Sequence, residues 1–152
     1  MSLRATDVDE VVEAAMLSLP PAAGEITVDV SPDLPEVAAD AGLLERALAN
    51  ILANARAWSP PDAPVRITAG AIGERVEIRV VDSGPGIPEV RREEAFQPFQ
   101  RLGDRNGNHP GGLGLGLAIA RGFVEAMGGE VGVEDTPGGG ATLVVSLPGA
   151  PG

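Results

Sequence analysis

Lysine, cysteine and tyrosine are absent from these 152 residues, and histidine occurs once. All 11 basic residues are arginine, which excludes the nucleotide sites that set a lysine ammonium against the phosphates, namely the Walker loop and the eukaryotic-type kinase site. Lysine Schiff-base chemistry is excluded as well. The absence of cysteine rules out disulfide frameworks and thiolate zinc sites. A single histidine leaves few ways to build a nucleophile–base pair or a metal cluster.

The sequence also lacks an apolar run near the roughly 18 to 20 residues that a spanning helix needs, and it has no signal-peptide pattern. Its hydrophobic content of 43% and charged content of 22% are typical of a globular domain. The net charge of −11 and the scattered arginines argue against nucleic acid as a partner. We therefore expect one soluble domain in a reducing compartment, most simply the cytoplasm.

Hydrophobic periodicity predicts three helices and five strands. Helical spacing of apolar residues, bounded by caps, prolines and glycines, indicates helices over residues 7–19, 43–58 and 115–127. Alternation indicates strands over residues 26–30, 65–71, 75–81, 130–134 and 141–147. Helices over one face of a single sheet predict an α/β (α+β) two-layer sandwich, with a mixed sheet of about five strands.

The second predicted helix carries two asparagines, Asn50 and Asn54. At about 100° per residue, both lie on the flank of an apolar stripe that consists of Leu44, Leu48, Ile51 and Ala55. An asparagine can ligate a hard cation through its carbonyl oxygen, and magnesium is usually held by few protein oxygens plus substrate phosphates. By itself the pair also fits two boundary amides that hydrogen-bond each other or solvent.

Asp82 follows a predicted strand and opens the loop Asp82-Ser83-Gly84-Pro85-Gly86-Ile87. A carboxylate at a strand end can accept a hydrogen bond from an exocyclic amine, and glycines let the backbone pass close to a planar ring. Adenine fits this geometry, which makes Asp82, Gly84, Gly86 and Ile87 candidate adenine contacts. The same pattern also occurs in plain turns.

A second glycine-rich stretch, Gly111-Gly112-Leu113-Gly114-Leu115-Gly116-Leu117, leads into the third helix. Glycines there leave backbone N–H groups facing an anion, and the positive end of the helix adds to the attraction. A triphosphate can therefore be bound without lysine, with candidate contacts at Gly112, Leu113, Gly114, Leu115 and Gly116. A flexible connector is the alternative. The helix that follows is apolar on most faces, so we expect it to be largely buried.

Two of the three phenylalanines, Phe96 and Phe99, lie in the polar connection between these glycine motifs, followed by Arg101 and His109. Aromatic residues in such a loop either dock on a partner or pin the loop to its own domain. The lone His109 is interpreted as solvated, with a phosphate contact as the alternative.

Taken in order, these blocks resemble the catalytic ATP-binding domain of sensor histidine kinases, a branch of the superfamily of gyrase, Hsp90 and MutL with the Bergerat fold. The resemblance covers about residues 5–148. The N box resembles residues 50–59, the G1 box 82–86, the F box 96–99 and the G2 box 112–117. The segment Gly140-Ala141-Thr142 resembles the closing motif.

By this resemblance, Asn54 would hold Mg²⁺ with Asn50 near the phosphates, Asp82 would bind the adenine amine and Thr142 would lie near the adenine end. Trp58 would replace the usual N-box tyrosine. The glycines of the G2 box would meet the phosphates beneath a lid over about residues 91–112, which includes the F box, Arg101 and His109.

The sequence departs from the family pattern at Ala57, where the N box often has a lysine that helps to hold phosphate. It also has Asn50 where ATP-hydrolysing members and anti-sigma serine kinases place a glutamate. An amide cannot accept the proton of a water or serine nucleophile, whereas a histidine imidazole is already nucleophilic. This difference favours the histidine-kinase branch.

The resemblance implies a domain that binds Mg-ATP and donates the γ-phosphoryl group to a histidine in two-component signal transduction. The phosphoacceptor helical hairpin is missing, so we expect a fragment of a longer kinase, with no phosphotransfer in isolation. The implied parent is a membrane-anchored homodimer with a response regulator downstream, similar to potassium-responsive sensor kinases; the isolated domain would be monomeric. The alternatives are a degenerate interaction module with weak or no ATP binding, and an ATP hydrolase.

Overall fold

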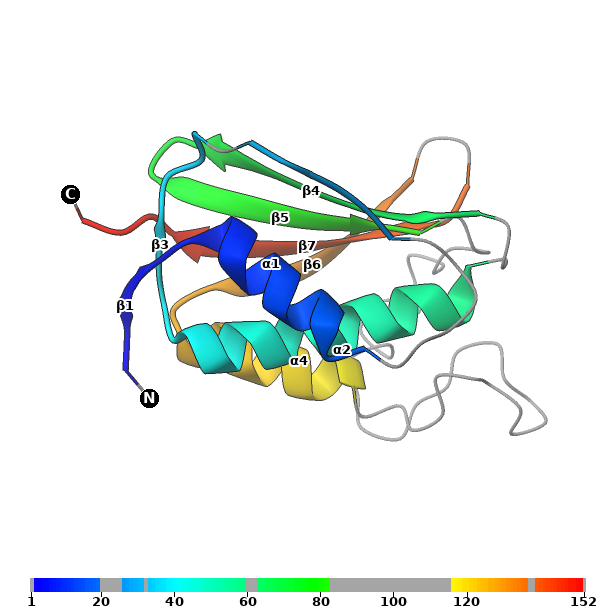
Figure 1. The fold of residues 1–152 in the computed structure, drawn as a ribbon, viewed down its shortest axis with the longest axis horizontal. Coiled ribbons are helices and arrows are strands. Elements are labelled where there is room, and N and C mark those ends of the chain that lie inside the picture. The colour runs from blue at the N-terminus through cyan, green and yellow to red at the C-terminus, as the bar shows by residue number, and fades with distance from the viewer. Residues whose placement is uncertain are drawn as a thin grey trace.

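The computed structural model describes residues 2–19, 26–31, 33–59, 63–82, 116–136 and 139–151. Five strands form one layer, and the helices of the described residues cover one of its faces (Figure 1). In chain order the elements are β1 (Arg4–Thr6), α1 (Val8–Leu17), β2 (Ile26–Val30), β3 (Val37–Ala39), α2 (Ala41–Trp58), β4 (Val65–Ile72), β5 (Arg75–Val81), α4 (Gly116–Ala126), β6 (Glu130–Asp135) and β7 (Ala141–Pro148). The predicted two-layer α/β sandwich is confirmed. Within the described ranges, no helix has the length and apolarity needed to cross a membrane.

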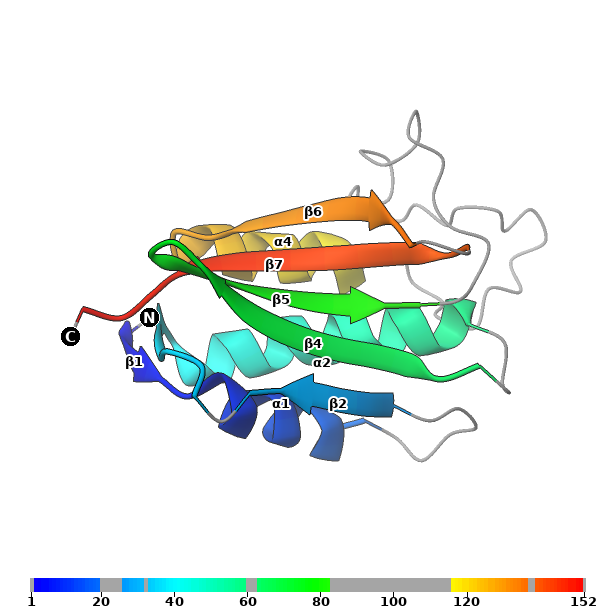
Figure 2. The ribbon, with the colours of Figure 1, turned by 90° about the horizontal axis from the view of Figure 1, so that it is seen from above.

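The main sheet is mixed, with the strand order β2-β4-β5-β7-β6 (Figure 2). Only β2 and β4 run parallel; the other neighbours are antiparallel. Burial alternates along β5, so that Val76, Ile78 and Val80 enter the core while the residues between them lie on the opposite face. The strands predicted over 65–71 and 75–81 pair as the hairpin of β4 and β5, whose turn contains Gly73 with a positive φ of 60°.

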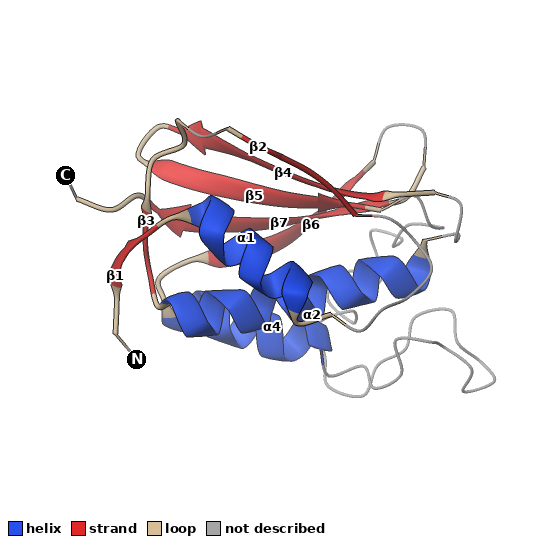
Figure 3. Cartoon of the chain, viewed as in Figure 1, coloured by secondary structure: helices blue, strands red, loops and turns tan. Residues whose placement is uncertain are grey.

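Burial of the predicted stripe on α2 holds the helical layer against the sheet (Figure 3, with helices in blue and strands in red). Leu44, Leu48, Ile51 and Ala55 are all fully buried, and each large side chain among them stabilises the fold by about 1.5–3 kcal/mol relative to an exposed position. On α4 the prediction of a largely buried helix is wrong in part, because Ile119 is 41% exposed. Among the described elements, the sheet and α2 cover one side of this helix.

A second, two-stranded sheet was not predicted. In it β1 pairs antiparallel with β3, and the pairs run from Arg4 with Ala39 to Thr6 with Val37. Strands of three residues are too short for alternation to stand out in the sequence. The hydroxyl of Thr6 donates to the carbonyl oxygens of Arg4 and Ala39, which ties the two strands together.

Asp40 caps α2 and also holds the N-terminal segment. Its carboxylate accepts hydrogen bonds from the main-chain N–H of Ser2 at 2.9 Å and of Leu43 at 3.1 Å. These bonds favour the charged form, so they lower the pKa of the Asp40 carboxyl below its ordinary value, with the Ser2 contact the larger cause. A carboxyl with a lowered folded-state pKa stabilises the protein above its unfolded pKa, and this contribution is lost as the pH falls through the folded pKa.

We therefore expect the stability advantage of the wild type over Asp40→Asn to shrink as the pH is lowered below about 4. The asparagine keeps an acceptor for the N–H of Leu43 but does not titrate, so the comparison isolates the ionisation of Asp40. Urea unfolding at a series of pH values measures the difference. A difference that stays constant into strong acid would contradict the role of ionisation.

Candidate nucleotide-binding site

Asp82 directly follows the last residue of β5 and is 4% exposed. It continues the alternation of Val76, Ile78 and Val80, so it stands on the face that the helices cover. Its main-chain N–H donates to the carbonyl oxygen of Ala141 at 3.0 Å, and its Oδ1 accepts from the N–H of Ala141 at 3.1 Å. Burying a carboxylate is costly unless hydrogen bonds compensate for the lost hydration. The buried carboxylate of Asp82 at the end of the strand is therefore a candidate functional group.

The two asparagines of α2 are both half-buried, on the flank of the buried stripe where helical geometry predicts them. They lie in the C-terminal half of α2, which points toward the same end of the sandwich as the C-terminus of β5 (Figure 1). In Figures 1 and 2, α4 begins beside this half of α2. Gly116 is the first residue of α4. Asn50, Asn54, Asp82 and Gly116 therefore belong to the same end of the domain.

Thr142 is the second residue of β7 and is 5% exposed. It pairs with Val81 in one neighbouring strand and with Glu134 in the other. Its main chain thus lies beside the strand end that carries Asp82. The hydroxyl lies 3.0 Å from that of Thr136, and alternation along β7 puts it on the sheet face opposite to the buried Ala141 and Leu143.

Many of the predicted contacts lie outside the described residues. They are Gly84, Gly86, Ile87, Phe96, Phe99, Arg101, His109, Gly112, Leu113, Gly114 and Leu115. Trp58 is the last residue of α2, and its side chain is also outside the described part. The described portion of the site thus consists of the sheet end, the flank of α2 and the start of α4.

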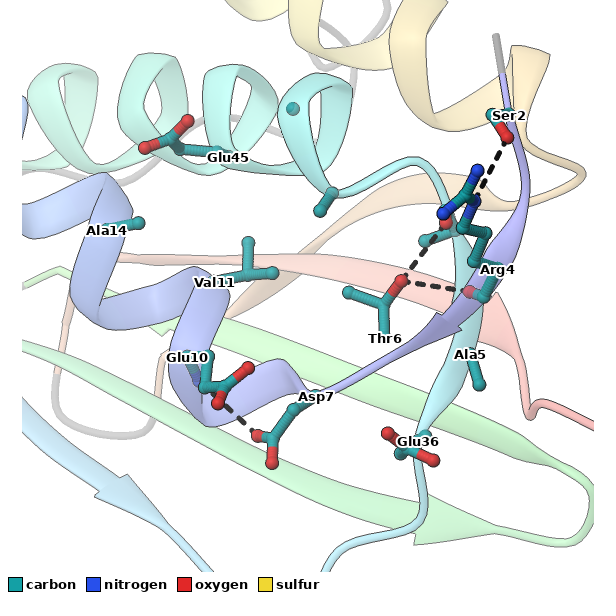
Figure 4. A pocket seen from close by; sticks show the side chains of 13 residues that line it. Ser2, Arg4, Ala5, Thr6, Asp7, Glu10, Val11, Ala14, Glu36 and Glu45 are labelled. Atoms are coloured by element: carbon teal, nitrogen blue, oxygen red, sulfur yellow. Dashed lines mark hydrogen bonds between the residues drawn. The ribbon is translucent and has the colours of Figure 1, made fainter.

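A pocket of about 380 Å³ lies at the other end of the domain, between the β1–β3 pair and the first turns of α1 and α2 (Figure 4). Its charged lining includes Arg4 and the carboxylates of Asp7, Glu10, Glu36 and Glu45. Gly42 in this lining is about 18 Å along the helix axis from Asn54, so the pocket is separate from the candidate site.

Among the residues that the structure describes, no group of three or more His, Cys, Asp or Glu side chains is arranged to hold a metal ion. The magnesium site predicted at Asn54 is of another kind, since it uses an amide oxygen together with phosphate oxygens. The side-chain carbonyl oxygens of the two asparagines are ligands of the type that magnesium accepts. They belong to the same end of the domain as the N-terminus of α4, which would face a phosphate.

The described residues form a two-layer α/β sandwich with a buried carboxylate at one end of its main sheet. Residues 39–151 match the family described as histidine kinase-, DNA gyrase B-, and HSP90-like ATPases, and the chain belongs to this family. It is 47% identical over 148 residues to the sensor protein KdpD of Rathayibacter rathayi, covering 97% of this chain and 17% of that protein. It is 46% identical over 153 residues to KdpD of Mycobacterium tuberculosis, covering 95% of this chain and again 17% of the relative.

Solved structures agree with this assignment. The mycobacterial sensor histidine kinase MprB superposes with a TM-score of 0.82 at 32% identity, over 99% of both chains. Full-length ShkA in complex with AMPPNP also gives a TM-score of 0.82, at 35% identity, over all of this chain and 32% of ShkA. The predicted resemblance to the ATP-binding domains of sensor histidine kinases is confirmed.

Sequence reasoning missed one part of the site, which is the main-chain N–H of Ala141 that holds Asp82. The hydrogen bond from this N–H to Oδ1 of Asp82 joins residues that are 59 positions apart in the chain. The run of glycines before Ala141 indicates a turn, but nothing in it shows that this turn closes on Asp82.

Proposed function

We propose that this chain is the ATP-binding catalytic domain of a sensor histidine kinase, and that it binds Mg-ATP and donates the γ-phosphoryl group to a histidine on a separate helical domain. The observation that carries the proposal is the buried carboxylate of Asp82, held by the N–H of Ala141 at the end of the sheet. It supplies an acceptor for the exocyclic amine of adenine. The similarity to ShkA, which was solved with AMPPNP, supports a nucleotide in this place.

Each group has a distinct role in the proposed complex. Asp82 accepts from the adenine amine, Gly84, Gly86 and Ile87 approach the ring, and Thr142 supports the adenine end from β7. Asn54 contributes its carbonyl oxygen to Mg²⁺, and Asn50 lies near the phosphates. When bound, magnesium neutralises part of the phosphate charge. The glycines from Gly112 to Gly116 and the N-terminus of α4 supply main-chain donors, which replace the lysine that this chain lacks.

The proposed reaction needs no general base from this chain. The nucleophile is the imidazole of a histidine on the partner domain. This imidazole attacks directly, without first giving up a proton to a carboxylate that acts as a base. The work of this domain is therefore to bind the nucleotide and to orient the γ-phosphoryl group. Hydrolysis of ATP is not supported, since Asn50 cannot act as a base toward water.

The likeness to KdpD points to a potassium-responsive sensor kinase as the parent protein. We propose that the parent is a membrane-anchored homodimer in which this domain faces the cytoplasm, and that its phosphorylated histidine passes the group to a response regulator. The chain spans 17% of the length of these relatives, and the domain alone is proposed to be a monomer.

The test is a calorimetric titration with a nonhydrolysable ATP analogue, with Mg²⁺ and with a chelator in its place. We expect saturable binding with Mg²⁺ and affinity weaker by about tenfold without it, because the phosphate charge is then less neutralised. Absence of both binding heat and a thermal shift at millimolar Mg-ATP would overturn the proposal in favour of a degenerate interaction module. Ala57, in place of the usual N-box lysine, is the feature that favours this alternative.

A further inference from the structure

In the turn between β6 and β7, the main chain of Gly140 lies so close to Asp82 that no side chain would fit at position 140. A Cβ atom added to Gly140 would collide with the carbonyl oxygen of Asp82, and it would stand 3.0 Å from Oδ1 of the same residue. Gly140 also has a φ of 102°, in the region that favours glycine. This position therefore requires glycine both for its backbone conformation and for its contact with Asp82.

Hydrogen bonds within the turn keep it closed against Asp82. The N–H of Thr136 donates to the carbonyl oxygen of Gly140 at 3.1 Å, and the N–H of Gly139 donates to the carbonyl oxygen of Thr136 at 2.9 Å. The hydroxyls of Thr136 and Thr142 lie 3.0 Å apart across the base of the turn. The N–H of Ala141 is thus presented to Oδ1 of Asp82 by a short, internally bonded segment.

We propose that Gly140 is a positioning residue, whose missing side chain lets the N–H of Ala141 set the rotation of the Asp82 carboxylate and so gives the site its selectivity for a purine with an exocyclic amine. The inference rests on the proposed function. The terminal torsion of an aspartate is broad and roughly two-fold, so a hydrogen bond to one oxygen selects the orientation of the other. A carboxylate offers about four lone-pair sites, so the bond to Ala141 is compatible with a second bond to the adenine amine.

Gly139 provides a matched control for Gly140. Its φ is 118°, so an alanine there meets a backbone cost of the same kind, yet an added Cβ finds no atom of the described residues within 4 Å. The pair Gly140→Ala and Gly139→Ala therefore separates the strain of a positive φ from the collision with Asp82. Gly132, where an added Cβ likewise meets none of the residues that the structure describes, provides a second control on β6.

The experiment compares the affinities of the full chain for ATP and for inosine triphosphate, both with Mg²⁺. Inosine carries an oxo group in place of the amine, so a fixed carboxylate repels it. We expect the wild type to prefer ATP by about tenfold or more, and Gly140→Ala to lose this preference through weaker ATP binding. Gly139→Ala should keep the preference. Circular dichroism and a thermal melt report whether each variant is folded.

Equal preference for ATP in Gly140→Ala and the wild type would overturn the positioning role, as would an equal loss in Gly139→Ala. Failure of the wild type itself to bind ATP would overturn the proposed function instead, so the two failures are distinguishable. If Gly140→Ala does not fold, the amide resonance of Ala141 in the wild type replaces it as the readout. That resonance should shift more with ATP than with inosine triphosphate, and equal shifts would contradict the proposal.

Discussion

Replacing Asp82 with asparagine is expected to weaken Mg-ATP binding by about 10- to 100-fold, because a hydrogen bond to a charged, buried acceptor is lost. The N–H of Ala141 would keep the amide oxygen of the asparagine as its partner, which turns the amide NH₂ group toward the adenine amine. Two donors would then face each other where the wild type has a donor and an acceptor. Calorimetric titration with a nonhydrolysable ATP analogue measures the change.

The control for this variant is Glu77→Gln. Glu77 lies on the same strand but on the opposite face, where it pairs with Arg79 at 3.0 Å, so its replacement removes an equal charge without touching the site. We expect its affinity for ATP to stay within a factor of about two of the wild type, since this partly exposed ion pair lies on the sheet face away from the site. Comparable losses in both variants would indicate a general charge effect and would count against an adenine contact at Asp82.

Replacing Asn54 with alanine is expected to remove the dependence of ATP binding on magnesium, with a loss of about tenfold or more when Mg²⁺ is present. The wild-type affinity with a chelator and the variant affinity with Mg²⁺ should then be similar. The helix itself should tolerate the change, since Asn54 is half-buried outside the central stripe and alanine is the better helix former. Titrations with and without Mg²⁺ give the comparison.

Asn54→Asp is the conservative variant for this test. A carboxylate oxygen also ligates magnesium, so this variant should keep the magnesium dependence that Asn54→Ala loses. Arg46→Ala, at an exposed position on the same helix, controls for changes in α2 that do not involve the site. A magnesium effect that survives in Asn54→Ala would assign the metal to other ligands.

Most of the secondary structure was predictable because it depends on short-range patterns. The strand over 75–81 was predicted with the bounds of β5, and the helix predicted over 7–19 is formed as α1, where Asp7 caps the first turn by accepting from the N–H of Asp9. The pairing of β1 with β3 was not predictable, because each strand is short and neither carries an alternating pattern. The exposure of Ile119 was missed for a related reason: an apolar residue does not reveal whether a second layer covers it.

The sequence by itself determined which residue types were present for chemistry, which stripe of α2 is buried, and that no lysine could assist the phosphates. These properties follow from composition and from periodicities of a few residues. Only the tertiary structure decided that the turn at Gly140 closes on Asp82 and that α4 begins beside the C-terminal half of α2. Such contacts join residues far apart in the chain, because strand order and layer packing, rather than local spacing, bring them together.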